Sequence, residues 1–230
     1  MKQPSLWDDT PASIGLVEQW ASSMGLWPVL GVDEVGRGCL AGPVVAAAVI
    51  LDEPIPGLND SKLLTSPARE RLAPEIQARA RAVAISAVDV SAIDSLNILR
   101  ATLLAMRKAC EGAMSALCGP VGIVVVDGTQ AIPQLDLPQR PWPKGDRLSW
   151  NCAAASIVAK VHRDHLMEEL DSLYPGYGFA VNKGYGTAQH LEALLRLGPS
   201  PVHRMSFAPC RAARQKASSI TLMSASPSLK

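Results

Sequence analysis

The 230-residue sequence has few aromatic side chains, no cysteines at C-x-x-C spacing and no long apolar run. Its five cysteines are an odd number, which argues against a disulfide framework and a structural zinc site and fits a reducing cytoplasm. No apolar stretch reaches the roughly 18 residues of a membrane-spanning helix, and the N-terminus lacks the apolar segment of a signal peptide. The net charge is only +1, so a polyanionic partner would have to be held by a local basic patch.

Apolar residues, in contrast, are plentiful: hydrophobic residues make up 48% of the chain and charged residues 19%. This composition excludes a wholly disordered chain and supplies a sizeable core. The length predicts one large domain with extensions. We expect an N-terminal extension with a short helix at 1–27, a main domain at 28–211 that is helical from about 170, and a disordered tail at 212–230.

Apolar periodicity predicts alternating strands and helices along the main domain. The expected strands lie at 29–32, 44–51, 82–90 and 121–126, with a short strand near 135–137. The expected helices lie at 13–24, 66–79, 97–117, 152–173 and 188–197. This interleaving predicts an α/β fold with the sheet between layers of helices.

Two of the predicted strands run into acidic residues. Asp33 and Glu34 interrupt one apolar run, and Asp127 ends another. An ionised carboxylate in an apolar sheet is costly unless it is paired or binds a metal. For Asp127 alone, an ordinary Asp-Gly turn at a strand end is the simpler explanation. The adjacent pair is the stronger signal, because nothing structural requires two neighbouring acids that repel each other.

A further acid lies on a predicted helix. Ser156, Lys160 and Asp164 are spaced i, i+4, i+8 and share one helix face, which could also be a solvated face with an ion pair between Lys160 and Asp164. Together with the strand acids, this carboxylate predicts an oxygen cage for hard cations such as Mg²⁺ or Mn²⁺. Two such ions can activate a water for in-line attack on phosphorus. His162 and His165 have too few neighbouring ligands for a zinc site and are expected on the surface.

A glycine-rich turn follows the first strand. Its glycines, Gly36, Gly38 and Gly42, are one residue too widely spaced for a dinucleotide-binding fingerprint, and an apolar strand follows where that fingerprint needs a helix. The turn instead suits close backbone approach to a sugar–phosphate chain, with Arg37 offering charge-assisted hydrogen bonds. A plain hairpin turn is the alternative.

These motifs in combination resemble the ribonuclease HII family over about residues 12–211. The resemblance is carried by residues 31–38 with 40–49, 58–62, 126–128, 144–146, 153–161 with 163–164, 177–179, 183–187 with 190–191, and 203–207. It implies a ribonuclease H-like α/β core, with a central mixed sheet flanked by helices and a small helical C-terminal extension. The chain departs from the usual pattern at Cys39, Leu63, Met205 and 150–152, and these positions bear on substrate affinity more than on the chemistry.

The resemblance also implies an activity. Members hydrolyse the RNA strand of RNA–DNA hybrids and cut 5′ of ribonucleotides embedded in duplex DNA, leaving a 3′-hydroxyl and a 5′-phosphate. The implied enzyme is a cytoplasmic monomer that uses Mn²⁺ or Mg²⁺. A non-catalytic hybrid-binding module of the same fold is the alternative, although such a module would not need a full set of acids.

The resemblance assigns roles to individual residues. It places the four active-site acids on Asp33, Glu34, Asp127 and Asp164, as metal ligands or, for Asp164, as a group that orients water. The loop of Gly36, Arg37 and Gly38 would read the 2′-hydroxyl, and Tyr185 would stack on the next deoxyribose. Plausible phosphate contacts are Lys62, Ser156 and Lys160; for Lys160, a salt bridge to a catalytic acid stays open.

Overall fold

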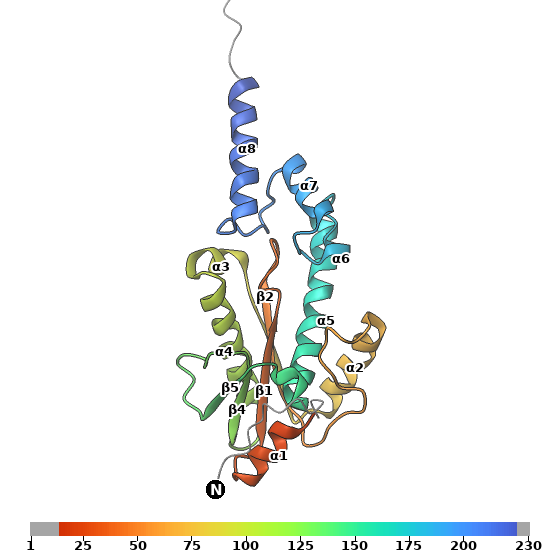
Figure 1. The fold of residues 1–230 in the computed structure, drawn as a ribbon, viewed down its shortest axis with the longest axis vertical. Helices are drawn as coiled ribbons and strands as arrows, with labels where there is room; N and C mark the ends of the chain where they lie inside the picture. Colours follow the sequence, from red (N-terminus) through yellow and green to blue (C-terminus); the bar gives the residue numbers. More distant parts are fainter. Residues whose placement is uncertain (1–13, 225–230) are drawn as a thin grey trace, which may run out of the picture.

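The computed structural model describes residues 14–224, which form one mixed sheet with helices on both faces (Figure 1). The strand order is β3-β2-β1-β4-β5, with β1 antiparallel to β2, β2 antiparallel to β3, and β1, β4 and β5 mutually parallel. The strands are β1 (Val29–Val35), β2 (Val44–Ile50), β3 (Ala82–Val88), β4 (Ile123–Asp127) and β5 (Gln139–Trp142). The expectation of a mixed central sheet flanked by helices is confirmed.

The helices connect and cover these strands. They are α1 (Leu16–Ser23), α2 (Ser66–Arg79), α3 (Val90–Leu96), α4 (Ile98–Ala116), α5 (Trp150–Leu173), α6 (Phe179–Asn182), α7 (Ala188–Leu197) and α8 (Ala208–Ser224), with one 3₁₀ turn, η1 (Gly145–Arg147). Helix α4 covers one face of the sheet, and α5 with α2 covers the other (Figure 1). No helix among residues 14–224 is long and apolar enough to cross a membrane.

Strand β2 is buried along its whole length because both of its faces are covered. Val44 and Ala46 point into the core shared with α3 and α4, whereas Val45 and Ala47 point into the core shared with α2 and α5. A strand buried on both faces gains from apolar residues at every position, which explains the uninterrupted run in the sequence. The same run leaves no alternation by which sequence analysis could assign faces.

Helix α5 packs directly on β1 through a glycine. A Cβ atom at Gly31 would lie 2.4 Å from the backbone of Asn151 and Cys152, so only glycine permits this approach. The parallel course of the strand and helix then brings successive residues of α5 beside successive residues of β1. The acids at the end of β1 therefore face the first turns of α5.

Several predicted elements have the expected place but different ends. Helix α2 has the predicted bounds, and Thr65 caps its N-terminus, because the Thr65 hydroxyl accepts the Ala68 N–H. The strand expected to reach residue 90 ends at Val88, and Asp89 caps the separate helix α3. The predicted strand near 135–137 is wrong: Leu135 packs into the core, and the strand pairs at Gln139–Trp142 instead.

The predicted disordered tail is wrong over residues 212–224, because α8 continues through them to Ser224. Cys210 and Ala213 lie three residues apart on this helix and are buried against Leu40 and Leu194. The sequence analysis missed this short apolar pair among the basic residues. Residues 225–230 of the expected tail, and 1–13 of the expected N-terminal extension, lie outside the described residues.

Candidate metal centre and nucleic-acid site

Three carboxylates meet at the carboxyl ends of two neighbouring parallel strands. Asp33 lies in β1 and Asp127 ends β4, and the two strands pair in register at Val32 and Val126. Asp146 joins them from η1, and ligand oxygens of the three side chains lie within 4.8 Å of one another. Oxygen ligands at this spacing suit a hard divalent cation such as Mg²⁺ or Mn²⁺.

Asp146 is brought to this group by a hydrogen bond of its neighbour. The Gly145 N–H donates to Asp127 Oδ1 at 2.7 Å, and Lys144 before it adopts a left-handed conformation with φ of 59°. The turn therefore docks onto the end of β4 and carries Asp146 with it. Sequence reasoning missed this acid, which lies in a proline-rich loop rather than at the end of a strand; the only signal was its place in the matched segment 144–146.

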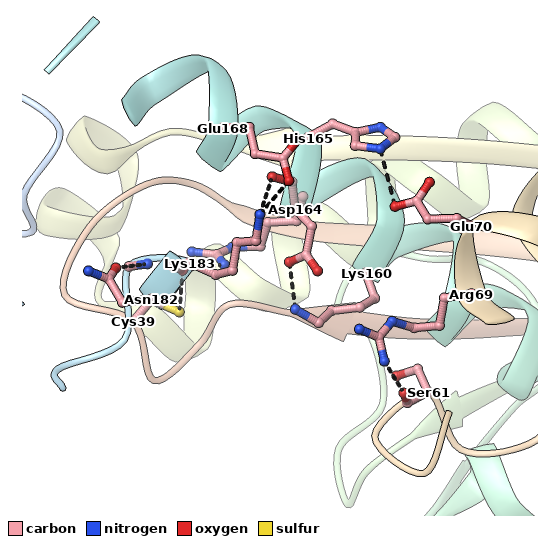
Figure 2. Close-up of polar contacts among 12 residues, drawn as sticks. Cys39, Ser61, Arg69, Glu70, Lys160, Asp164, His165, Glu168, Asn182 and Lys183 are labelled. Atoms are coloured by element: carbon pink, nitrogen blue, oxygen red, sulfur yellow. Dashed lines mark hydrogen bonds and ion pairs between the residues drawn. The ribbon is translucent and has the colours of Figure 1, made fainter. Parts of the chain in front are cut away.

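Asp164, which the resemblance placed among the four acids, lies outside this group. Ser156 of α5 lies beside Asp33, and Asp164 comes eight residues later, about 12 Å farther along the helix axis. Its carboxylate accepts a hydrogen bond from Lys160 Nζ at 2.5 Å (Figure 2). The structure thus brings Asp33, Asp127 and Asp146 together. Asp164 lies closer to the turn that carries Tyr185, where Lys183 Nζ contacts its backbone carbonyl.

Glu34 lies next to the three-carboxylate group but points to the glycine loop. Its carboxylate accepts from Arg37 Nη1 at 3.3 Å, and burial raises its pKa although Arg37 opposes the shift. Asp127 also raises the pKa of Glu34 by repulsion, which shows that the two carboxylates lie close enough to interact. Glu34 is therefore a candidate fourth ligand beside the three carboxylates.

The carboxylate group is under electrostatic strain when no cation is bound. Burial first, and then repulsion from Asp127 and Glu34, raise the pKa of Asp33 well above its ordinary value. Burial and the carboxylates of Asp127 and Asp60 raise the pKa of Asp146 to about 6. Carboxylates that resist ionisation next to one another are stabilised when a divalent cation neutralises them.

Lys62 faces the same carboxylates. Burial would lower the pKa of its ammonium group, but Asp146, Asp60 and Asp33 outweigh burial and raise it. Asp60 holds the residue in place, since its Oδ1 accepts the Lys62 N–H at 2.9 Å while its Oδ2 pairs with Arg147. Lys62 therefore places a positive charge beside the proposed ion site, on a backbone that Asp60 holds. Asp60 is a second residue that sequence reasoning missed.

Ser156 and Lys160 have partners inside the protein. Ser156 is 4% exposed, shares a 2.7 Å hydrogen bond with Ser61, and stabilises the ionised Asp33 carboxylate. This placement favours a role in orienting Asp33 over the phosphate contact that the sequence analysis expected. Lys160 forms the ion pair with Asp164, which was the alternative left open for it. Of the helix face that Ser156, Lys160 and Asp164 share, only Lys160 is partly exposed, and Ser156 and Asp164 are buried.

Two further polar contacts continue along α5 (Figure 2). His165 Nε2 lies 3.2 Å from Glu70 Oε1 with both side chains exposed, so this histidine lies on the surface as predicted. Lys183 pairs with Glu168 at 2.6 Å. Among residues 14–224 the only group of three or more metal-ligating side chains is the one at Asp33, and the five cysteines are free.

The glycine loop and Tyr185 lie side by side although they are far apart in sequence. Leu40 N–H donates to the Gly184 carbonyl at 2.8 Å, and Cys39 Sγ lies 3.5 Å from the Lys183 carbonyl. Arg37 is half exposed on the loop, and Tyr185 is 43% exposed. The structure thus presents a cation and an aromatic ring on one surface, next to Glu34 and the metal centre.

Two buried histidines, His190 and His203, form a chain of hydrogen bonds to the Tyr185 backbone. His190 Nδ1 lies 2.8 Å from the Tyr185 carbonyl, and His190 Nε2 lies 3.1 Å from His203 Nε2. Ser200 N–H donates to His203 Nδ1, so the chain of hydrogen bonds is complete when both rings are neutral. Burial and His190 lower the pKa of His203 to about 4, which keeps the arrangement intact at neutral pH.

The strain among the acids leads to a stability prediction. In the metal-free protein at pH 7, Asp146 is ionised against its neighbours, so Asp146→Asn should raise the free energy of unfolding by roughly 1–2 kcal/mol. That gain corresponds to about 2–8 °C in Tm. At pH 4 the wild-type group is already protonated in the folded state, and the gain should vanish.

Thermal melts of the two proteins in EDTA at pH 7 and pH 4 would measure this difference. Comparing the variant with wild type at each pH cancels the contributions of titratable groups that do not interact with Asp146. An equal Tm difference at both pH values would contradict the electrostatic origin.

Comparison with known proteins places these residues in a family. The family model described as Ribonuclease HII matches residues 30–210. A curated Ribonuclease HII of Halorhodospira halophila is 53% identical over 189 residues, which cover 82% of this chain and 96% of the relative. Among solved structures, the ribonuclease H2 of Pyrococcus horikoshii OT3 is 25% identical with a TM-score of 0.66, over 82% of this chain and 97% of that one.

A solved structure of Bst-RNase HIII in complex with Mn²⁺ is also similar in fold. It has a TM-score of 0.68 at 22% identity and covers 82% of this chain and 70% of that one. The two structural neighbours confirm the ribonuclease H-like fold that the sequence motifs implied. The matched family segment includes the ends of β1 and β4 and the 3₁₀ turn, so it spans the whole carboxylate group.

Proposed function

Since this chain belongs to the ribonuclease HII family, whose members are metal-dependent hydrolases of RNA in RNA–DNA hybrids, we propose that it cuts 5′ of ribonucleotides embedded in duplex DNA, with Asp33, Asp127 and Asp146 as its metal ligands. The observation that carries the proposal is the convergence of these three acids beside the glycine loop. The products would be a 3′-hydroxyl and a 5′-phosphate. Long RNA–DNA hybrids are the second proposed substrate.

Bound divalent ions at the three acids would supply Lewis-acid stabilisation of the phosphorus centre and activation of the attacking water. The donor set is all oxygen and fits Mg²⁺ and Mn²⁺ equally well. Glu34, adjacent in sequence to Asp33, completes the proposed set. Ser156 supports it by stabilising the ionised form of Asp33.

Lys62 has a proposed role beside these metal ligands. Lys62 is held protonated by the surrounding carboxylates, so it can donate hydrogen bonds to a non-bridging oxygen of the scissile phosphate. Charge stabilisation that is already in position costs no reorganisation when the bond breaks. Asp60 holds the Lys62 backbone and is itself paired with Arg147, so these two residues need not touch the substrate.

Recognition of the ribonucleotide is proposed for the glycine loop and Tyr185. Gly36 and Gly38 leave the backbone of the loop open to a sugar edge, and the 2′-hydroxyl is the only group that distinguishes RNA from DNA at one nucleotide. Arg37 would contact the neighbouring phosphate, and the Tyr185 ring would stack on the next deoxyribose. A non-catalytic binding module would not require the repelling acids, which cost stability without a cation. A cytoplasmic monomer remains a prediction.

Cleavage of a labelled DNA duplex carrying one ribonucleotide tests the proposal, with Mg²⁺, with Mn²⁺ and with EDTA. We expect metal-dependent cleavage on the 5′ side of the ribonucleotide and none of an all-DNA duplex. Tyr185→Ala should lower kcat/KM on this substrate by about 10–100-fold while leaving Tm nearly unchanged, because loss of a stacking contact costs about 1–3 kcal/mol. An unchanged rate for the variant would exclude stacking, and tight binding without cleavage would favour the binding module.

A further inference from the structure

Two arginines are fully buried directly beneath the glycine loop. Arg163 of α5 and Arg204, which follows α7, are both 0% exposed. Within residues 14–224 neither guanidinium group forms an ion pair with a carboxylate. A buried charge without a counterion is costly unless it is hydrogen-bonded, so the question is what the hydrogen bonds of these arginines hold in place.

Every hydrogen bond donated by Arg163 goes to a backbone carbonyl. Its Nε, Nη1 and Nη2 donate to the carbonyls of Pro43, Lys183 and Ala41, at 3.0, 2.8 and 3.1 Å. One planar group therefore ties the end of the glycine hairpin to the turn that precedes Tyr185. These two segments are about 140 residues apart in the chain, so only noncovalent contacts can fix their relative position.

Arg204 holds the other side of the same hairpin. Its Nε and Nη2 both donate to the Gly42 carbonyl, at 3.0 and 2.8 Å, and its Nη1 donates to the Arg37 carbonyl at 3.0 Å. Arg37 is the residue at the tip of the proposed recognition loop. Burial lowers the pKa of Arg204 to about 10, so the group remains charged at neutral pH.

The glycine loop packs closely against Arg163 and against the turn that precedes Tyr185. A Cβ atom at Gly36 would lie 2.2 Å from Arg163 Nε, and one at Gly184 would lie 2.6 Å from the Ala41 carbonyl oxygen. The loop backbone therefore rests directly on the arginine side chains, without intervening side chains of its own. Glycine is needed at both positions because a Cβ atom would collide with these neighbours and because both residues have positive φ angles.

We propose that Arg163 and Arg204 are positioning residues for ribonucleotide recognition, which fix the glycine loop and the Tyr185 turn in the one relative arrangement that fits a single nucleotide. This inference rests on the recognition role proposed above for that loop and for Tyr185. A rigid guanidinium fork can hold two or three carbonyls at defined angles, whereas a lysine ammonium group cannot reproduce that geometry. The arginines act through the loop and need not touch the substrate.

The test compares Arg163→Lys and Arg204→Lys with Arg81→Lys. Arg81 serves as the control because its side chain forms an exposed ion pair with Asp52. Its backbone N–H donates to the Ile50 carbonyl, at the end of β2 that lies away from the glycine loop. Binding is measured in EDTA, without catalysis, to an all-DNA duplex and to the same duplex carrying one ribonucleotide. The ratio of the two affinities reports recognition of the 2′-hydroxyl alone.

We expect wild type and Arg81→Lys to favour the ribonucleotide duplex by about tenfold, the worth of one good hydrogen bond. Both buried-arginine variants should lose most of that preference while their affinity for all-DNA duplex stays within about twofold. A variant that keeps the wild-type preference, or that loses affinity for both duplexes equally, would overturn the positioning role. Absence of any preference in wild type would overturn the recognition function itself, and this inference with it.

Thermal melts check that the variants fold. If a lysine variant does not fold, Gly184→Ala provides a second route, because its new methyl group would push on the Ala41 carbonyl and displace the loop from the turn without changing any charge. The same loss of preference is expected for it. A fully retained preference in Gly184→Ala would show that the fixed arrangement is not needed.

Discussion

Asp127→Asn should abolish cleavage, with kcat/KM falling at least about 1,000-fold, while binding to an RNA–DNA hybrid in EDTA is retained or slightly strengthened. Asp127 ends β4 and offers its oxygens to the same point as Asp33 and Asp146. A neutral amide is a much poorer ligand for Mg²⁺ or Mn²⁺, and several kcal/mol of transition-state stabilisation depend on the ions. Removing one negative charge also lessens repulsion of the phosphate backbone.

Two measurements on this variant distinguish chemistry from binding. Single-turnover cleavage of a labelled hybrid gives the chemical step, and fluorescence anisotropy in EDTA gives the affinity. Asn at this position can still accept the Gly145 N–H bond through its amide oxygen, so the turn carrying Asp146 should stay in place. Equal losses of affinity and rate would contradict a role for Asp127 in metal binding.

Asp146→Asn should lower activity by about 1,000-fold, whereas Asp164→Asn should lower it by less than about tenfold. Asp146 shares the point of convergence with Asp33 and Asp127, while Asp164 is paired with Lys160 about two helical turns beyond Ser156. Asp164 lies outside the group of three acids, so losing its ion pair with Lys160 would affect the chemistry only indirectly. Initial rates of both variants on one substrate, over a range of Mn²⁺ concentrations, measure the contrast.

The decisive feature of that experiment is the concentration dependence. For Asp146→Asn, high Mn²⁺ should recover part of the activity, since a weakened site can still be filled by mass action. For Asp164→Asn, the Mn²⁺ dependence should match that of wild type. A larger loss in Asp164→Asn than in Asp146→Asn would mean that the acids regroup when ions and substrate bind.

The sequence predicts the strands and helices best where local signals agree. Helix α7 has the predicted bounds, because Thr187 accepts the His190 N–H at one end and Gly198 follows the other. The continuous apolar run predicts strand β2, although its three alanines at 46–48 also suit a helix. The helix α3 was missed because Val90 and Ile93 continue the apolar character of β3, and only the Asp89 cap separates the two.

The candidate site was partly predictable for a similar reason. Asp33 and Asp127 end adjacent parallel strands, so strand assignment alone brings them to one edge of the sheet. Asp146 reaches them through the Gly145 hydrogen bond in a loop with no periodicity, and nothing local indicates that contact. Asp164 was favoured by a helix face that it shares with Ser156 and Lys160, but that face is long enough to leave it far from the acids.

The buried arginines show a second limit of sequence reasoning. Arginine is seldom buried, so Arg163 and Arg204 give no sign in the sequence of lying inside the protein. Their role follows only from which carbonyls they contact, and those belong to loops that converge in the folded chain. A backbone carbonyl can belong to any residue type, so the acceptors of these hydrogen bonds leave no signal in the sequence. For this reason the two arginines lie within matched motifs without an assigned function.

Direct binding of Mn²⁺ tests the central claim, that Asp33, Asp127 and Asp146 form the metal centre. Isothermal titration of wild type, Asp146→Asn and Asp164→Asn at pH 7, without nucleic acid, gives the affinity of each protein for the ion. The structure predicts that Asp146→Asn binds Mn²⁺ at least about tenfold more weakly than wild type and that Asp164→Asn binds it as wild type does. Wild-type affinity in Asp146→Asn together with weakened binding in Asp164→Asn would contradict the assignment.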